Sequence, residues 1–212
     1  MNDELLNQYL QETIPLNEEW VNKLESYAKE NHVPIMDAVS MHFLQQLIRI
    51  HQPARILEIG TAIGYSALRM LQANPNATIT TIERDEERFK YALDVIKAQN
   101  KLQQIQVIHG DALEVVEEIR NQDQFDFMFI DAAKGQYKRF FELYSPSIRK
   151  GGLIISDNVL FKGYVANPSN DNPKFTKIAN KINNYNQWLI NNENFHTVIV
   201  PIGDGIAISI KK

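Results

Sequence analysis

Strand-like and helix-like patterns alternate regularly from residue 55 onward, and this alternation constrains the fold more than any other feature. Short apolar runs are each followed by a longer segment with helical periodicity. The strands are expected at residues 55–60, 78–83, 105–109, 125–131, 152–157, 195–200 and 205–210. The helices between them are expected at residues 64–73, 85–100, 112–121, 134–148 and 174–191. Repeated strand–helix units of this kind build a parallel sheet covered by helices on both faces.

The two ends of the chain modify this plan. Three helical segments are expected in residues 3–50: one before Pro15, one over residues 17–31, and one from Asp37, a suitable N-cap, to Ile50. Only residues 201–204 separate the last two strands, which therefore predict a hairpin and an antiparallel edge. A polar loop is expected over residues 158–173. We expect one α/β domain over residues 1–212, with residues 1–50 as a helical extension.

Composition narrows the class of protein. Apolar residues make up 44% of the chain and charged residues 23%, which is ordinary for a soluble globular protein. The net charge of −4 provides no overall positive surface for nucleic acid, although a local basic patch is compatible with it. The absence of cysteine excludes disulfides and thiolate metal centres and suits a reducing compartment. The sequence shows no signal peptide or membrane span, so we expect a cytoplasmic protein that does not bind membranes.

Polar side chains close two neighbouring apolar strands. Asp131 ends the run FDFMFID, and Asp157 and Asn158 end GLIISDN. A charge at the end of an apolar run is costly without a partner. Three oxygen ligands at one edge of a sheet are what a small hard cation such as Mg²⁺ requires. These three residues therefore form a candidate magnesium site.

A glycine turn follows the first strand of the sheet. In EIGTAIGYS, Gly60 and Gly64 bracket a turn in which a ligand can approach the backbone closely. Dinucleotide sites use the spacing G-x-G-x-x-G, whereas here it is G-x-x-x-G with the acidic Glu58 just ahead. An acidic residue repels phosphate and suits a cation, so the turn favours S-adenosylmethionine over NAD. The alternative is an ordinary connection with incidental glycines.

Three further charged residues carry both a functional and a structural interpretation. Glu83 ends the second strand, 23 residues after Gly60, where a carboxylate can accept the ribose hydroxyls of a cofactor; alternatively it is a solvated charge. Asp111 in HGDA can accept the adenine amino group, cap the next helix, or do both. Lys134 near a helix start is electrostatically disfavoured, which makes it a candidate general base; alternatively it is a surface lysine.

Four motifs together resemble the metal-dependent O-methyltransferases related to catechol and caffeoyl-CoA O-methyltransferases. These motifs are EIGTAIGYS, FIDAAKGQY, DNVLFKGYVANP and PIGDGIAI, and the resemblance runs over about residues 30–212. Within that group, VPIMDAVSMHFL ahead of ILEIGTAIGYSALRM is most similar to the bacterial tRNA 5-hydroxyuridine methyltransferases. The resemblance implies a Rossmann-like, seven-stranded, mostly parallel methyltransferase sheet with an antiparallel edge hairpin.

The resemblance also implies roles for individual residues. It assigns the metal to Asp131, Asp157 and Asn158, and catalysis to Lys134 together with Asp131. It assigns S-adenosylmethionine to Met36, Ser66, Glu83, Asp111, Ala112 and Asp131, beside the Gly60 turn. After Asn158 the chain carries Phe161 where plant enzymes carry a tryptophan, which argues against a phenylpropanoid-CoA substrate.

The expected chemistry is transfer of a methyl group to a hydroxyl that lies beside a second oxygen, both of which can chelate Mg²⁺. The 5-hydroxyuridine of a tRNA anticodon loop meets this requirement, and so do catechol-like molecules and phenolic acyl-CoA esters. Basic residues that include Lys162, Lys174 and Lys177 border the expected site and favour tRNA. A nicotinamide oxidoreductase would need the three-glycine turn, and a silent binding protein would not need the acidic set with Lys134. The amphipathic N-terminal helices suggest a homodimer.

Overall fold

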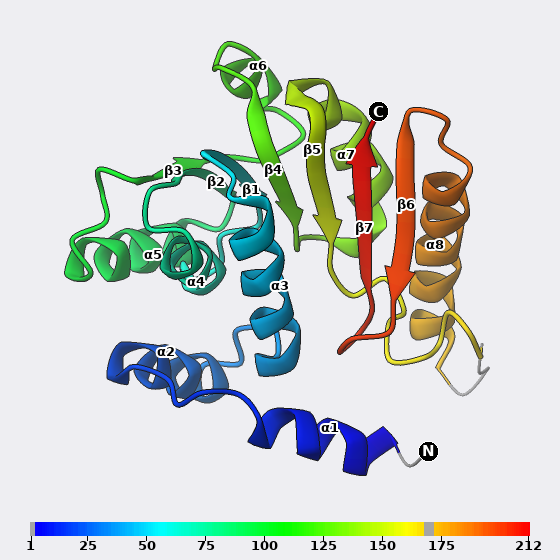
Figure 1. Ribbon diagram of the computed structural model, residues 1–212, viewed down its shortest axis with the longest axis horizontal. Coiled ribbons are helices and arrows are strands. Elements are labelled where there is room, and N and C mark those ends of the chain that lie inside the picture. Colours follow the sequence, from blue (N-terminus) through cyan, green and yellow to red (C-terminus); the bar gives the residue numbers. More distant parts are fainter. Residues whose placement is uncertain (1–2, 168–171) are drawn as a thin grey trace.

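The computed structural model of the protein, which describes residues 3–167 and 172–212, contains one seven-stranded sheet (Figure 1). The strand order is β3-β2-β1-β4-β5-β7-β6. The strands are β1 (Arg55–Ile59), β2 (Thr78–Glu83), β3 (Ile105–His109), β4 (Phe125–Ile130), β5 (Ile148–Ser156), β6 (Phe195–Val200) and β7 (Ile206–Lys211). Strands β1 to β5 pair in parallel, and β7 is antiparallel to both β5 and β6. The predicted fold class is confirmed.

Helices cover both faces of the sheet, and each covered face has its own apolar core. The helices are α1 (Asp3–Glu12), α2 (Glu19–Glu30), α3 (Ala38–His51), α4 (Tyr65–Ala73), α5 (Glu86–Ala98), α6 (Val116–Arg120), α7 (Tyr137–Tyr144) and α8 (Pro173–Ile190). Alternate residues of β4 enter opposite cores: Phe127 and Phe129 pack with α2 to α5, while Met128 and Ile130 pack with α6 to α8. Burial on both faces explains why β4 is a continuous apolar run.

The helical extension joins the sheet through α3. Asp37 is the N-cap of α3, and its side chain accepts hydrogen bonds from the amides of Val39 and Ser40 at 3.0 Å, as predicted. Helix α1 lies beyond α3 at the periphery of the molecule (Figure 1). No helix of the described chain is long and apolar enough to cross a membrane.

Three element boundaries differ from the prediction. The helix expected at residues 112–121 is reduced to α6, because Asp111 binds the amide of Leu113 and holds a turn instead. The helix expected at residues 134–148 becomes a 3₁₀ turn (Lys134–Gln136), α7 and a second 3₁₀ turn (Ser145–Ser147) that contains Pro146. Strand β5 begins at Ile148, four residues before the predicted strand, and its register with β4 shifts near Phe125. Within the loop expected at residues 158–173, residues 168–171 lie outside the described chain.

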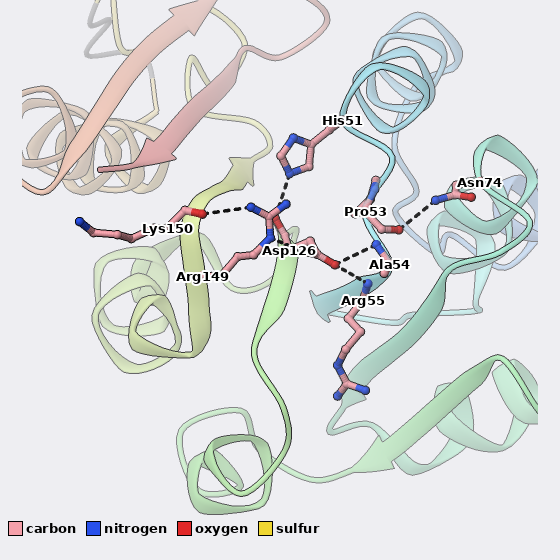
Figure 2. A network of polar contacts seen from close by, with 8 residues as sticks. All are labelled: His51, Pro53, Ala54, Arg55, Asn74, Asp126, Arg149 and Lys150. Atoms are coloured by element: carbon pink, nitrogen blue, oxygen red, sulfur yellow. Dashed lines mark hydrogen bonds and ion pairs between the residues drawn. The ribbon is translucent and has the colours of Figure 1, made fainter.

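A polar network fastens the amino-terminal edge of the sheet (Figure 2). Oδ2 of Asp126 accepts hydrogen bonds from the amides of Ala54 and Arg55, both at 2.8 Å. Oδ1 of the same side chain accepts one from Nε of Arg149 at 2.5 Å. One carboxylate thus ties the starts of β1, β4 and β5 together at the edge opposite the candidate site.

Candidate functional site

A cavity of about 530 Å³ lies at the carboxyl ends of β1 to β5. All ten candidate residues from the sequence line it: Met36, Gly60, Ser66, Glu83, Asp111, Ala112, Asp131, Lys134, Asp157 and Asn158. Five of them follow or end five successive parallel strands, and Met36 comes from the segment before α3. The carboxyl ends of parallel strands meet at one edge, and ligands of open α/β sheets bind at this edge. The sheet therefore brings residues from 36 to 158 into one space.

The turn after β1 requires glycine at position 60. Gly60 has a φ of +104°, and a Cβ atom at this position would lie 2.2 Å from the carbonyl oxygen of Asp131. The amides of Gly60 and Thr61 both donate to the carbonyl of Ile82, at 3.1 and 3.2 Å. The ends of β1 and β4 thus lie close together and form the floor of the cavity. Any side chain at position 60 would push these two strand ends apart.

Glu83 is fixed in place by the backbone around it. Its Oε2 accepts a hydrogen bond from the amide of Ala62, and its Oε1 accepts one from the amide of Asp85, both at 2.8 Å. The side chain is 8% exposed and lines the cavity. Each carboxylate oxygen has a further lone pair, so Glu83 can still accept hydrogen bonds from a ligand. The interpretation as a freely solvated charge is wrong.

Glu58 lies under the cavity and is not part of its lining. Its side chain is fully buried, and both oxygens accept hydroxyl hydrogen bonds, from Ser66 at 2.5 Å and from Thr81 at 2.6 Å. Burial raises the pKa of Glu58 to about 7 against the lowering effect of the two hydroxyls. The expectation that Glu58 faces a cationic ligand is therefore not met. It holds Ser66, which does line the cavity.

Asp111 lies at the other end of the cavity, beside Ala112. Its Oδ1 accepts a hydrogen bond from the amide of Leu113 at 2.8 Å. Helix α6 begins later and has Val115 as its N-cap, without a side-chain capping bond. Asp111 therefore holds a local turn and does not cap the helix, which corrects that alternative. Its Oδ2 lies 4.0 Å from Nη1 of Arg84, another residue of the cavity wall.

Asp131 and Asp157 place two carboxyl groups on the floor of the cavity. Burial raises the pKa of Asp131, and the positive charge of Lys134 opposes the shift. Burial, together with the charge of Asp131, raises the pKa of Asp157 to about 8. Asp157 is 1% exposed, and its Oδ1 accepts a hydrogen bond from the amide of Asn158 at 2.7 Å. Burial thus disfavours the charged form of both carboxyl groups unless a cation compensates for it.

Lys134 and Asn158 meet beside these carboxyl groups. Nζ of Lys134 donates a hydrogen bond to Oδ1 of Asn158 at 2.7 Å. Asn158 has a φ of +56°, in the left-handed region that asparagine tolerates better than most residues. Lys134 begins a 3₁₀ turn, where the sequence predicted the start of an α-helix. Its partial burial and its partner argue against an ordinary surface lysine.

The side chains of this corner fit a divalent cation. Two carboxylates and one amide supply hard oxygen ligands, which Mg²⁺ prefers, and the positive charge of Lys134 does not prevent the pKa of both acids from rising. In the described part of the chain, no three His, Cys, Asp or Glu side chains lie close enough together to bind one metal ion. A cation in this corner would therefore depend on Asn158 as well as on the two acids.

One wall of the cavity was missed at the sequence level. Asp204, in the loop between β6 and β7, lines the cavity, and its Oδ1 accepts a hydrogen bond from the amide of Lys162 at 2.8 Å. The same loop packs on the start of α3, since a Cβ atom on Gly203 would lie 2.0 Å from Oγ of Ser40. Asp204 belongs to the motif PIGDGIAI, which the sequence analysis identified, but only the fold shows that this motif lines the cavity.

Comparisons with known proteins show the family of this chain and agree with its fold. A family model described as O-methyltransferase matches residues 11–212. A candidate caffeoyl-CoA O-methyltransferase of Arabidopsis thaliana is 31% identical over 98% of this chain and 94% of its own length. A solved structure of a candidate caffeoyl-CoA O-methyltransferase from Staphylococcus aureus is 37% identical, with a TM-score of 0.89 over 100% of this chain and 99% of that one. The Bacillus cereus O-methyltransferase, solved with SAH, is 26% identical, with a TM-score of 0.84 over 98% of this chain and 97% of that one.

Proposed function

This chain belongs to the O-methyltransferase family, and we propose that it methylates the 5-hydroxyl of 5-hydroxyuridine at the wobble position of tRNA, giving 5-methoxyuridine. The methyl group comes from S-adenosylmethionine. The observation that carries the proposal is that one cavity has two distinct halves. One half contains the glycine turn with Glu83 and Asp111. The other half contains Asp131, Lys134, Asp157 and Asn158. The first half suits S-adenosylmethionine and the second a hydroxyl with a neighbouring oxygen.

The half of the cavity that would hold S-adenosylmethionine contains two carboxylates, Glu83 and Asp111. Glu83 and Asp111 present carboxylate oxygens that suit ribose hydroxyls and an adenine amino group. Met36 is buried and supplies apolar surface to the same wall. S-adenosylmethionine carries no phosphate, and the turn has the spacing G-x-x-x-G without the third glycine of a dinucleotide site, so this half of the cavity favours S-adenosylmethionine over NAD.

The other half can activate a hydroxyl. When bound, S-adenosylmethionine supplies an electrophilic methyl group, and Mg²⁺ held by Asp131, Asp157 and Asn158 would lower the pKa of the substrate hydroxyl. Lys134 is held at the same corner by its hydrogen bond to Asn158. Lys134 is the candidate general base, and its Nζ would take the hydroxyl proton. The buried floor around Asp157 keeps water away from the reacting groups.

The choice of tRNA rests on three supports. Residues 33–70 carry the motifs that resemble those of the bacterial tRNA 5-hydroxyuridine methyltransferases. The base offers its 5-hydroxyl and its 4-carbonyl as two neighbouring oxygens, as a catechol does. Lysines 162, 174 and 177 are exposed on the loop and helix that follow Asn158. An anticodon base would have to be unstacked to enter the cavity.

A small catechol-like molecule or a phenolic acyl-CoA ester is the second candidate substrate. It is favoured by the names of the similar proteins from A. thaliana and S. aureus, both described as candidate caffeoyl-CoA O-methyltransferases. The same two-oxygen chemistry applies to both kinds of substrate. The difference lies outside the reacting centre, in what holds the remainder of the substrate.

One incubation separates the two candidates. Purified protein with Mg²⁺ and S-adenosylmethionine is given hydroxyuridine-bearing tRNA in one reaction and a panel of catechols and catechol-CoA esters in another. Mass spectrometry of nucleosides from the first reaction is expected to show 5-methoxyuridine. Efficient turnover of the small phenols with unmodified tRNA would overturn the proposal in favour of the second candidate.

The same proposal includes a homodimer. Apolar side chains of α1 are exposed, among them Leu5 and Tyr9 at 65% and 64%. Val198 on β6 and Ile210 on β7 are also exposed, at 53% and 42%. A second copy that covered these surfaces would remove apolar area from water. Sedimentation of the purified protein tests this part of the proposal separately.

A further inference from the structure

The solvent-exposed face of α8 carries two parallel rows of side chains, which are polar apart from Pro173. Lys177 and Lys181 form one row with Pro173, and Thr176, Asn180 and Asn184 form the other, each at intervals of four residues. These six residues line a shallow, open surface groove along the helix. The opposite face of the helix is buried through residues that include Ile182, Tyr185 and Leu189. At 1.5 Å per residue, the row from Thr176 to Asn184 is about 12 Å long.

This groove is positively charged within an acidic protein. Helix α8 contains three lysines and no acidic residue, whereas the whole chain has a net charge of −4. In the described chain, no carboxylate lies within ion-pair distance of Lys174, Lys177 or Lys181. Like charges four residues apart destabilise a helix slightly, so Lys177 and Lys181 do not serve the stability of α8. Their arrangement suits an anionic ligand.

The groove connects with the catalytic cavity through Gly135. A Cβ atom on Gly135 would lie 3.4 Å from Nζ of Lys181, so the end of this lysine passes directly over the glycine. The preceding residue, Lys134, lines the cavity and binds Asn158. On the neighbouring helix α7, Lys138 and Arg139 are exposed, and Glu142 pairs with Lys138 at 3.7 Å. Positive charge thus continues from α8 to the mouth of the cavity.

We infer that the groove on α8 binds the phosphate backbone of the single-stranded RNA whose base enters the cavity. This inference rests on the proposed tRNA substrate. Lysine and asparagine side chains bind phosphate and sugar oxygens without reading sequence, which positions the strand and leaves recognition of the base to the cavity. An RNA strand presents a phosphate at every nucleotide. This regular repeat of phosphates matches the regular repeat of polar side chains along α8. An acyl-CoA carries its phosphates on one compact end.

The test is a double variant, Lys177→Ala with Lys181→Ala, compared with Lys97→Ala combined with Lys150→Ala. The control removes two exposed charges from α5 and from the start of β5, away from the cavity. Binding of tRNA is measured by fluorescence anisotropy between about 50 and 200 mM salt, because counterion release makes each bound phosphate visible in the salt slope. Titration with S-adenosylmethionine and thermal melting show that both proteins are folded.

The groove variant is expected to bind tRNA roughly tenfold more weakly at low salt, with a salt slope smaller by about 0.7 for each phosphate that it no longer neutralises. Its methylation of tRNA should fall in parallel, whereas the control should match the wild type. Unchanged tRNA binding and slope in the groove variant would overturn the inference while wild-type tRNA methylation still supports the function. Equal losses in the control, or a loss confined to catechol-CoA turnover, would also overturn it. A wild-type protein that neither binds nor methylates tRNA would overturn both.

Discussion

Nζ of Lys134 donates a hydrogen bond to Oδ1 of Asn158 at 2.7 Å, which joins the candidate base to a candidate metal ligand. The two residues are 24 positions apart and come from the segments after β4 and β5. An amide oxygen has two lone pairs, so Asn158 can hold Lys134 and still bind a cation. This hydrogen bond fixes where a substrate proton can be taken up.

Replacing Lys134 by alanine should lower turnover about 10²- to 10⁴-fold, the range for loss of a general base. The affinity for S-adenosylmethionine should change much less, and the loss should shrink at high pH, where hydroxide competes. Lys134→Arg is the matched control, because arginine keeps the charge but does not lose its proton. If Lys134→Arg retained full turnover, Lys134 would be acting through its charge alone.

Removing divalent cations with EDTA should abolish methyl transfer, and Mg²⁺ should restore it. Mg²⁺ should also raise the melting temperature, since a ligand at 100 times its Kd stabilises the folded state by about 2.7 kcal/mol. Asp157→Asn should lose that Mg²⁺-dependent rise, whereas Asp94→Asn on the exposed side of α5 should keep it. Full turnover in EDTA would rule out the metal.

Many of the residues that form the candidate site could be predicted from the sequence, because their positions depend on the topology of the sheet. Parallel strands deliver their carboxyl ends to one edge, so polar residues placed just after apolar runs, such as Asp131 and Asp157, must meet there. Five of the ten candidate residues, one from each of β1 to β5, line the cavity for this reason. The alternation of strand and helix patterns indicated a parallel sheet, whereas the strand order, in which β4 lies beside β1 and not beside β3, comes from the structure.

What could not be predicted depends on side-chain partners. Glu58 looked like a ligand because it precedes the glycine turn, but Ser66 and Thr81 take both of its oxygens beneath the floor. Asp111 looked like a helix cap, but its bond to the amide of Leu113 delays the helix. Asp204 comes from a hairpin 46 residues after Asn158, the last of the ten candidate residues. Periodicity carries no information about these choices.

Glu83→Ala should weaken binding of S-adenosylmethionine at least tenfold, because hydrogen bonds to a charged acceptor contribute about 1.5–3 kcal/mol each. Part of the loss will come from the turn, since the amide of Ala62 also loses its acceptor. Glu87→Ala, on the exposed face of α5, is the control. Isothermal titration with S-adenosylmethionine and with NADH provides the measurement. Tighter binding of NADH would mean that the glycine turn serves a dinucleotide.

Glu58 should make the protein less stable as the pH rises. The pKa of its carboxyl is raised from 4.5 to about 7 in the folded state, so its contribution is present below pH 4.5 and is lost as the pH rises through about 7. A rise of this size corresponds to about 3 kcal/mol. Glu58→Gln removes the charge, so the variant should match the wild type near pH 5 and exceed its stability near pH 8. Urea unfolding at both pH values measures the difference, and equal pH dependence in the two proteins would exclude Glu58 as its source.

Asp126→Ala should destabilise the protein by about 3 kcal/mol, because its carboxylate accepts three hydrogen bonds at the amino-terminal edge of the sheet (Figure 2). Burial alone would raise the pKa of Asp126, but Arg149 and the two amides lower it overall, so this stability is lost as the pH falls below about 3.8. Arg149→Ala should cost less, about 1 kcal/mol, since that side chain is 44% exposed and the amide bonds remain. Urea unfolding gives both values.

The network lies opposite the cavity, so folded Asp126→Ala protein should bind S-adenosylmethionine with wild-type affinity. An equal loss of stability in the two variants would show that the ion pair, and not the two amide bonds, holds this edge of the sheet.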